Sequence, residues 1–211
     1  MALLPLAAKD ANGVAQSMVA FQDASSNNIP AVTLDSSRAT YRFAAVFTPY
    51  ATSALTLIQI QGSATKTVRV IRIAAAPTTV TAAASISGYL TRNSAAGTGG
   101  TGVTPTAAKL DTNSPAATAV VTHYTTAAQS VGTTVGGPLS QFVLGVTIVS
   151  VPTITIQNQM QMIFPEVGNV NGQALVLRGT SDYITVVNTT PASFANAISF
   201  SYVVELVEDA S

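Results

Sequence analysis

The segment Gly62–Thr67 (GSATKT) holds the residue types that come closest to phosphate chemistry in this sequence. A phosphate-binding loop needs two glycines separated by four residues, followed by Lys and Ser or Thr at the start of a helix. Here Gly62 is the only glycine, and the residues after Lys66 are mostly β-branched. The helix N-terminus that would hold the phosphate is therefore missing, and the segment predicts a structural strand.

Three basic residues, Lys66, Arg69 and Arg72, follow one another in this strand. Strict alternation predicts one face with Lys66, Val68, Val70 and Arg72, and an opposite face with Thr67, Arg69, Ile71 and Ile73. Neither face is a continuous basic stripe, and no aromatic residues are interleaved for stacking on bases, so we expect no nucleic-acid partner. An arginine between apolar neighbours can reach solvent or an acceptor on another subunit. We therefore interpret Lys66, Arg69 and Arg72 as candidate subunit contacts.

The other ionisable residues do not predict a catalytic or metal site. His123 is the only histidine, and we interpret it as a strand residue without a chemical role. Four aspartates have turn-forming neighbours and predict turns: Asp10, Asp23, Asp111 and Asp182. Glu205, Glu208 and Asp209 predict a small, solvated acidic end. We expect no enzyme, no cofactor and no metal, although a glycosidase pair of carboxylates stays open.

Aromatic residues are too few to favour a carbohydrate-binding module, which usually offers exposed aromatic platforms. Trp is absent, and Phe and Tyr together make up 6% of the chain. Four tyrosines keep this alternative open: Tyr41, Tyr50, Tyr89 and Tyr124.

Charge is scarce in this chain. Charged residues make up 9% of it, against about 25% in a typical soluble domain, and the formal net charge is zero. A net charge near zero gives no long-range field for nucleic acid and favours contact between copies. The absence of cysteine excludes disulfides and thiolate sites. The opening MALLPLAAKD lacks the features of a secretory signal, and no apolar run reaches about 18 residues, so no membrane partner is expected.

The elements that position these residues are predicted to be strands throughout. Runs rich in Val, Ile, Thr, Tyr and Phe alternate with clusters of Gly, Pro, Asn and Ser, and this pattern predicts an all-β chain. The number and spacing of the strands favour an antiparallel β-sandwich that is jelly-roll-like. Residues 1–40 are predicted to form an N-terminal arm or hairpin, and residues 41–211 the sandwich domain, with a long loop near 93–115.

Two finer predictions concern how the strands connect. The sequence AAAPT (74–78) predicts a turn that ends the strand carrying the arginines. Residues 173–208 contain three strand-like runs, QALVLRG, DYITVVNTT and AISFSYVVELVE, with short connections between them. Short connections predict that these three runs pair in order, as an antiparallel meander.

Several segments resemble a family of tailed-bacteriophage virion structural proteins. The run YRFAAVFTPYATSALTLIQIQGSATKTVRVIRI (41–73) is similar to the core of that family, which the GSATKTVRV block marks. The loop from Gly97 to Thr125, the ending from Gln173 to Glu208 and the opening KDANGVAQSM are also similar. The resemblance covers most of the chain, and its motifs are structural rather than catalytic. It implies a component of the virion.

The resemblance leads to two hypotheses of function. The first is a capsid decoration, or cement, protein on the capsid surface, which stabilises the head by binding across neighbouring subunits of the major capsid protein. Such proteins commonly form homotrimers, and this one would assemble in the host bacterial cytoplasm. The alternative is a tail or fibre component with a structural or receptor-binding role. A third reading, a virion glycan hydrolase, lacks a convergent site in the sequence.

Overall fold

The structure is a computed structural model that describes residues 5–9, 15–19, 21–22, 28–29, 38–48, 56–80, 84–125, 130–146, 161–164, 174–189 and 198–210. Apart from the last two residues, the chain divides into two compact units, Met1–Arg38 and Ala39–Asp209. The predicted turn residues Asp10 and Asp23 lie outside the described residues, and so does Tyr50.

The first unit contains two small antiparallel ladders. β1 (Pro5–Lys9) pairs with β2 (Ala15–Val19), and β3 (Phe21–Gln22) pairs with β4 (Asn28–Ile29). Each ladder has two strands in the residues described. A two-stranded ladder is marginally stable at best in water, because it has little apolar surface to bury.

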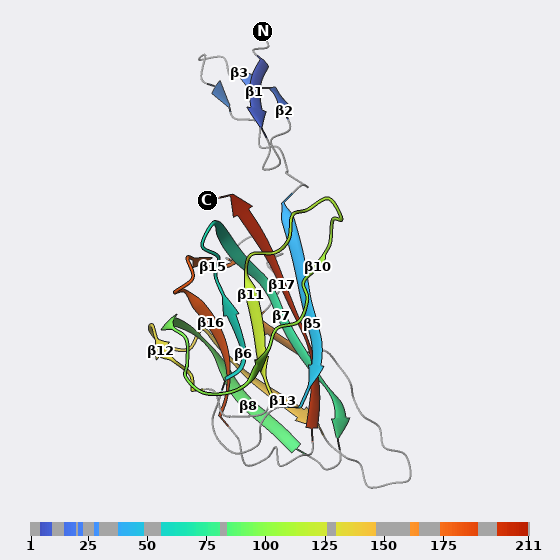
Figure 1. Ribbon diagram of the computed structural model, residues 1–211, viewed down its shortest axis with the longest axis vertical. Coiled ribbons are helices and arrows are strands. Elements are labelled where there is room, and N and C mark those ends of the chain that lie inside the picture. The colour runs from blue at the N-terminus through green and yellow to red at the C-terminus, as the bar shows by residue number, and fades with distance from the viewer. Residues whose placement is uncertain are drawn as a thin grey trace. The chain divides into compact units, whose positions relative to one another are not determined.

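The second unit consists of two antiparallel sheets packed together as a β-sandwich (Figure 1). Sheet 1 has the order β10 (Ala108–Lys109), β5 (Ala39–Phe47), β17 (Ile198–Ala210) and β7 (Lys66–Val80), and both β14 (Gln161–Phe164) and β15 (Leu175–Arg178) pair with β7. Sheet 2 has the order β12 (Thr133–Thr134), β8 (Ala84–Ala95), β16 (Tyr183–Asn188), β6 (Thr56–Gln61), β11 (Val120–Tyr124) and β9 (Gly102–Val103), and β13 (Ser140–Val146) also pairs with β8.

The pairing of the eight principal strands is nested. In chain order these strands are β5, β6, β7, β8, β13, β15, β16 and β17. The first pairs with the eighth, the second with the seventh, the third with the sixth and the fourth with the fifth. Alternate pairs lie in opposite sheets. This is the connectivity of a jelly roll, so the predicted fold class is confirmed.

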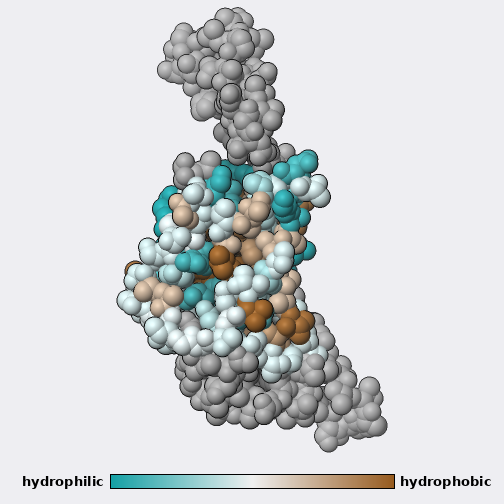
Figure 2. All heavy atoms as spheres, viewed as in Figure 1, coloured by the Kyte–Doolittle hydropathy of each residue, from teal (hydrophilic) through white to brown (hydrophobic). Residues whose placement is uncertain are grey.

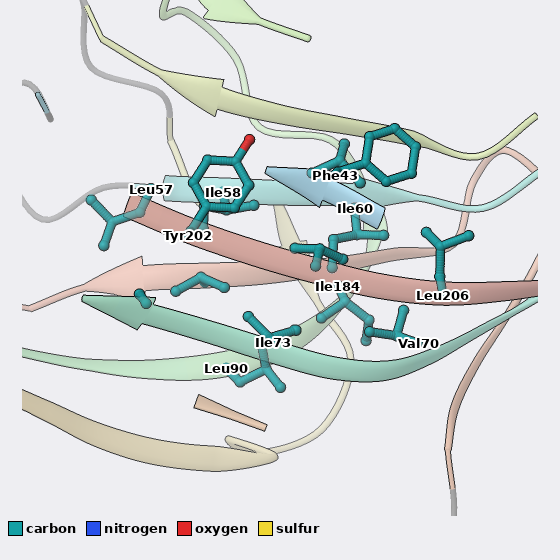
Figure 3. Packing of buried hydrophobic residues seen from close by; sticks show 14 of the residues in the cluster. Phe43, Leu57, Ile58, Ile60, Val70, Ile73, Leu90, Ile184, Tyr202 and Leu206 are labelled. Atoms are coloured by element: carbon teal, nitrogen blue, oxygen red, sulfur yellow. The ribbon is translucent and has the colours of Figure 1, made fainter. Parts of the chain in front are cut away.

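The hydrophobic core lies between the two sheets, and this position explains why apolar and polar residues alternate along a strand such as β17. Phe200, Tyr202, Val204 and Leu206 of β17 are all almost fully buried. Figure 3 shows two of them, Tyr202 and Leu206, in the same cluster as Ile58, Ile60 and Ile184 of sheet 2. Full burial of one large aliphatic side chain contributes about 1.5–3 kcal/mol, so this layer supplies the main stabilising term.

Two predicted connections are wrong. β7 continues without a break from Lys66 to Val80, so AAAPT is part of a strand and not a turn. The last three runs form strands, but they do not pair as a meander: β15 joins β7, β16 joins β6 and β8, and β17 joins β5. Each strand of the three lies in the opposite sheet from the one before it. The length of a short connection does not reveal whether it forms a hairpin within one sheet or crosses to the other sheet.

Candidate functional site

A cluster of ion pairs occupies the outer side of sheet 1. Because the even-numbered residues of β17 face the core, Glu205 and Asp209 lie on the opposite side of the strand. Arg42 stands directly opposite Glu205 on β5. Its Nε donates to Glu205 Oε1 at 2.7 Å, and its Nη2 lies 2.5 Å from the same oxygen. We call Arg42, Arg69, Arg72, Glu205 and Asp209 the arginine face.

β7 contributes Arg69 and Arg72 to the arginine face. Arg69 Nε donates to Asp209 Oδ2, and Arg72 Nη1 lies 3.8 Å from Glu205 Oε2. Glu205 thus lies between arginines from two neighbouring strands. The guanidinium of Arg72 is also incompletely satisfied, since its buried Nε has no hydrogen-bond partner among the described residues.

The predicted division of β7 into two faces is wrong at Arg72. Val68, Val70 and Ile73 are all fully buried, and the last two are three residues apart. The inward alternation therefore shifts by one residue between Val70 and Ile73. This shift turns Arg72 to the same outer side as Arg69, so both arginines can reach carboxylates of β17.

Lys66, the third candidate contact, is not part of the arginine face. It begins β7, and its backbone N–H donates to Ser63 Oγ at 3.1 Å. None of the ion pairs in the described part of the chain includes Lys66. Arg42 was not among the predicted contact residues, although its position between the core residues Tyr41 and Phe43 of β5 predicts an outward side chain.

A second polar cluster crosses the end of the sandwich. The carboxylate of buried Glu208 accepts hydrogen bonds from the backbone N–H groups of Thr118 and Ala119, both at 2.7 Å, and lies 2.8 Å from the Thr118 hydroxyl. Thr118 Oγ1 is also 2.7 Å from Ser63 Oγ. Because a hydroxyl has one proton and an ionised carboxylate only accepts, Thr118 donates to Glu208 and Ser63 donates to Thr118.

This cluster explains the conformation of the GSATKT segment. Ser63 Oγ accepts from the backbone N–H groups of Thr65 and Lys66, both at 3.1 Å, and so caps the turn between β6 and β7. Gly62 permits a close approach: a Cβ there would lie 2.5 Å from the carbonyl oxygen of Gly179 in the β15–β16 turn. The segment is a turn that links the two sheets, and its polar groups are used within the fold.

The predicted solvated acidic end is wrong. Glu205 and Glu208 are 6% and 5% exposed. Both belong to β17, one bound by arginines and the other by N–H and hydroxyl donors. By contrast, the predicted turn roles of Asp111 and Asp182 are confirmed, since their carboxylates accept from Asn113 N–H and Arg178 N–H.

His123 is buried inside the sandwich. Its Nδ1 lies 3.0 Å from the Tyr202 hydroxyl, and its ring centre lies 4.8 Å from that of Phe47. Burial lowers the pKa of His123, because an imidazolium would lose its hydration there. Burial also raises the pKa of the Tyr202 phenol. The pair is therefore neutral near pH 7 and packs as part of the core.

The described residues offer no metal-binding group of three or more His, Cys, Asp or Glu side chains. Within the same residues, no helix is long and apolar enough to cross a membrane. Among the described residues, Tyr41, Tyr89 and Tyr124 do not form an aromatic platform together. Tyr41 is fully buried and donates to Pro115 O, and Tyr124 donates to Gln59 Oε1, while Tyr89 is half-buried on β8.

Exposed apolar residues are scattered over the sandwich. The most exposed large ones are Val46 (64%), Val143 (61%) and Leu110 (53%), which lie on three different segments. Figure 2 shows one side of the molecule, where hydrophobic atoms form separate spots among pale, near-neutral residues. Single exposed valines and leucines are ordinary on protein surfaces and do not by themselves mark an interface.

No family model, curated protein or solved structure matches this chain.

Proposed function

We propose that this chain is a structural protein of a bacteriophage virion, and specifically a capsid decoration protein. It would bind across neighbouring subunits of the major capsid protein on the outside of the head, as a homotrimer. The observation that carries the proposal is the combination of a jelly-roll sandwich with an N-terminal unit of two small ladders. The resemblance of residues 41–73 to virion proteins supports the same conclusion.

The N-terminal unit supports a role in contact with a partner. It has 38 residues, and the chain has no cysteine to cross-link it. Units below about 40 residues rarely fold alone without disulfides, metals or a partner. A neighbouring subunit would offer this unit apolar surface to pack against, so its folding would be coupled to assembly.

The arginine face supports a polar subunit contact. Arg42, Arg69 and Arg72 are 47%, 38% and 29% exposed at their side chains, while Glu205 and Asp209 are 8% and 18% exposed. The carboxylates are thus covered, and the arginines present the remaining donors to the outside. Arginine is enriched in protein interfaces because its planar group makes several directed hydrogen bonds.

Such a protein acts by mass action. A protein that binds the assembled shell and not its separated subunits shifts the equilibrium toward the shell. The stabilising free energy grows with the logarithm of the ratio of the free protein concentration to its Kd. No catalytic step is needed.

The test is to mix the purified full chain with expanded capsids that lack it, and to measure co-sedimentation and the melting temperature of the capsid. We expect binding and a higher melting temperature. The double variant Arg69→Ala, Arg72→Ala should bind more weakly than Lys109→Ala, which removes an exposed cation elsewhere. Absence of binding at virion-like concentrations would refute the proposal, and a label found on the tail would favour a tail or fibre component.

A further inference from the structure

An open hollow lies on sheet 2, away from the arginine face. Its volume is about 450 Å³, and it is lined by residues 87–89 of β8, residues 141–143 of β13 and Thr189. Leu90 is fully buried in the core, so its neighbour Tyr89 lies on the outer side of the sheet. The size falls in the range of small-molecule sites, roughly 300–1,000 Å³.

Gly88 and Phe142, which also line the hollow, pair across two strands. Gly88 of β8 stands opposite Phe142 of β13. A Cβ on Gly88 would lie 2.3 Å from Cζ of Phe142 and 2.2 Å from the Val187 carbonyl oxygen. The ring thus takes the space that a side chain would fill, and residue 88 adds only backbone to the hollow.

The lining is neutral and rich in hydroxyl and amide groups. None of its residues is charged, and Ser87, Tyr89, Gln141 and Thr189 each carry a side-chain donor and acceptor. Thr189 is held in place, because its N–H and its hydroxyl both donate to Ser87 O at 2.8 Å. Val143 and the Tyr89 ring add apolar surface beside these groups.

This combination selects one ligand chemistry. A phosphate or carboxylate would lack a cation to pair with, and a purely apolar ligand would displace water from the Tyr89 hydroxyl and the Gln141 amide without replacing its hydrogen bonds. A sugar ring has hydroxyls around its edge and an apolar C–H face that packs on an aromatic ring.

We propose that this hollow binds a single neutral pyranose ring, with Tyr89 as the packing surface and Gln141 as the main hydrogen-bonding side chain. The site is open and takes about a dozen non-hydrogen atoms of the ligand, so we expect a dissociation constant near 1 mM. The inference does not rest on the proposed function, because it concerns a different surface.

The experiment is saturation-transfer NMR on the full chain with glucose, galactose, rhamnose and N-acetylglucosamine, each titrated to about ten times the expected dissociation constant. We expect transfer to at least one of these neutral sugars and none to N-acetylneuraminic acid, whose carboxylate has no cation in the hollow. The neutral panel also shows which ring substituents the site accepts.

Two variants and one control locate the binding. Tyr89→Ala and Gln141→Ala should each weaken it about tenfold, whereas Val46→Ala, on the outer side of sheet 1, should leave it unchanged. Gln141 is exposed, so its variant tests the site even if Tyr89→Ala fails to fold. Transfer to none of the neutral sugars, equal transfer to N-acetylneuraminic acid, or full binding by Gln141→Ala would each overturn the proposal.

Discussion

The hydroxyl of Thr118 lies 2.8 Å from the carboxylate of Glu208, although 90 residues separate the two in the sequence. This contact joins the segment before β11 to the last strand of the sandwich. Glu208 is 5% exposed and takes three hydrogen bonds from Thr118 and Ala119, so its buried carboxyl group is satisfied by donors that the fold positions.

Glu208→Gln should destabilise the sandwich by about 1.5–3 kcal/mol, because hydrogen bonds to a charged group are lost and an amide N–H₂ replaces an acceptor. Urea unfolding followed by circular dichroism measures the change. Asp209→Asn is the matched control: its partner Arg69 is 38% exposed, and such an ion pair contributes at most about 1 kcal/mol. Equal losses in the two variants would contradict the role given to Glu208.

Thr185→Val should leave stability unchanged or raise it by about 1 kcal/mol. Thr185 is fully buried on β16, and its hydroxyl has no hydrogen-bond partner among the described residues. Valine keeps the shape and removes an unpaired polar group. The same substitution at Thr118 removes a bonded hydroxyl and should lower stability. Unfolding midpoints of the two variants give the comparison, and a loss at Thr185 as large as that at Thr118 would show that its hydroxyl is satisfied.

Acid should destabilise the protein through His123. The fold lowers the pKa of His123, so the unfolded chain takes up the proton first as the pH falls. Stability is then constant above about pH 7 and decreases below the unfolded pKa of about 6.5, by up to about 1.4 kcal/mol per pH unit. Unfolding free energies between pH 5.5 and 8 measure this slope.

The variant His123→Gln serves as the reference for that slope, since it keeps a polar side chain near Tyr202 and cannot titrate. Its stability should depend less on pH across the same interval. Parallel curves for the two proteins would show that another group is responsible.

Gly62→Ala should cost about 1–3 kcal/mol, because its Cβ would lie 2.5 Å from Gly179 O and 3.1 Å from Leu177 Cβ. The obstacle is backbone, which cannot move aside as a flexible side chain can. Gly137→Ala is the control, as its added Cβ would have nothing within 4 Å. Thermal melting of both variants distinguishes close packing at residue 62 from a general sensitivity to alanine.

The sequence predicted what depends on local pattern. Alternation in β17 located its core residues, and the β-branched runs indicated the longer strands of the sandwich, whereas β9 and β10 lie within residues 93–115, which were predicted to be a loop. Which strands pair with one another was harder to predict from the sequence, because a short connection can turn back within one sheet or cross to the other. The meander predicted for the last three runs was wrong for that reason.

The candidate site was predicted in part. The predicted residues Arg69 and Arg72 belong to the arginine face together with Arg42. The side of the strand on which Arg72 lies depends on the shift in alternation between Val70 and Ile73, and no residue type in β7 indicates that shift. The burial of Glu208 depends on Thr118, whose position is set by a segment far away in the sequence. Acidic residues near a chain end are usually solvated, so only the fold could show that these are not.

The nested pairing has a consequence for how the protein is made. Arg42 of β5 and its partner Glu205 of β17 are 163 residues apart, so the strand that opens the sandwich is synthesised long before its neighbour. At roughly 5–20 residues per second, a ribosome needs about 10–30 seconds to cover that distance. Throughout this interval Tyr41, Phe43 and Phe47 lack the partner that completes their burial. Sheet 1 therefore completes its pairing only after β17 has emerged, and we expect β5 to be open to non-native pairing with other nascent chains until then.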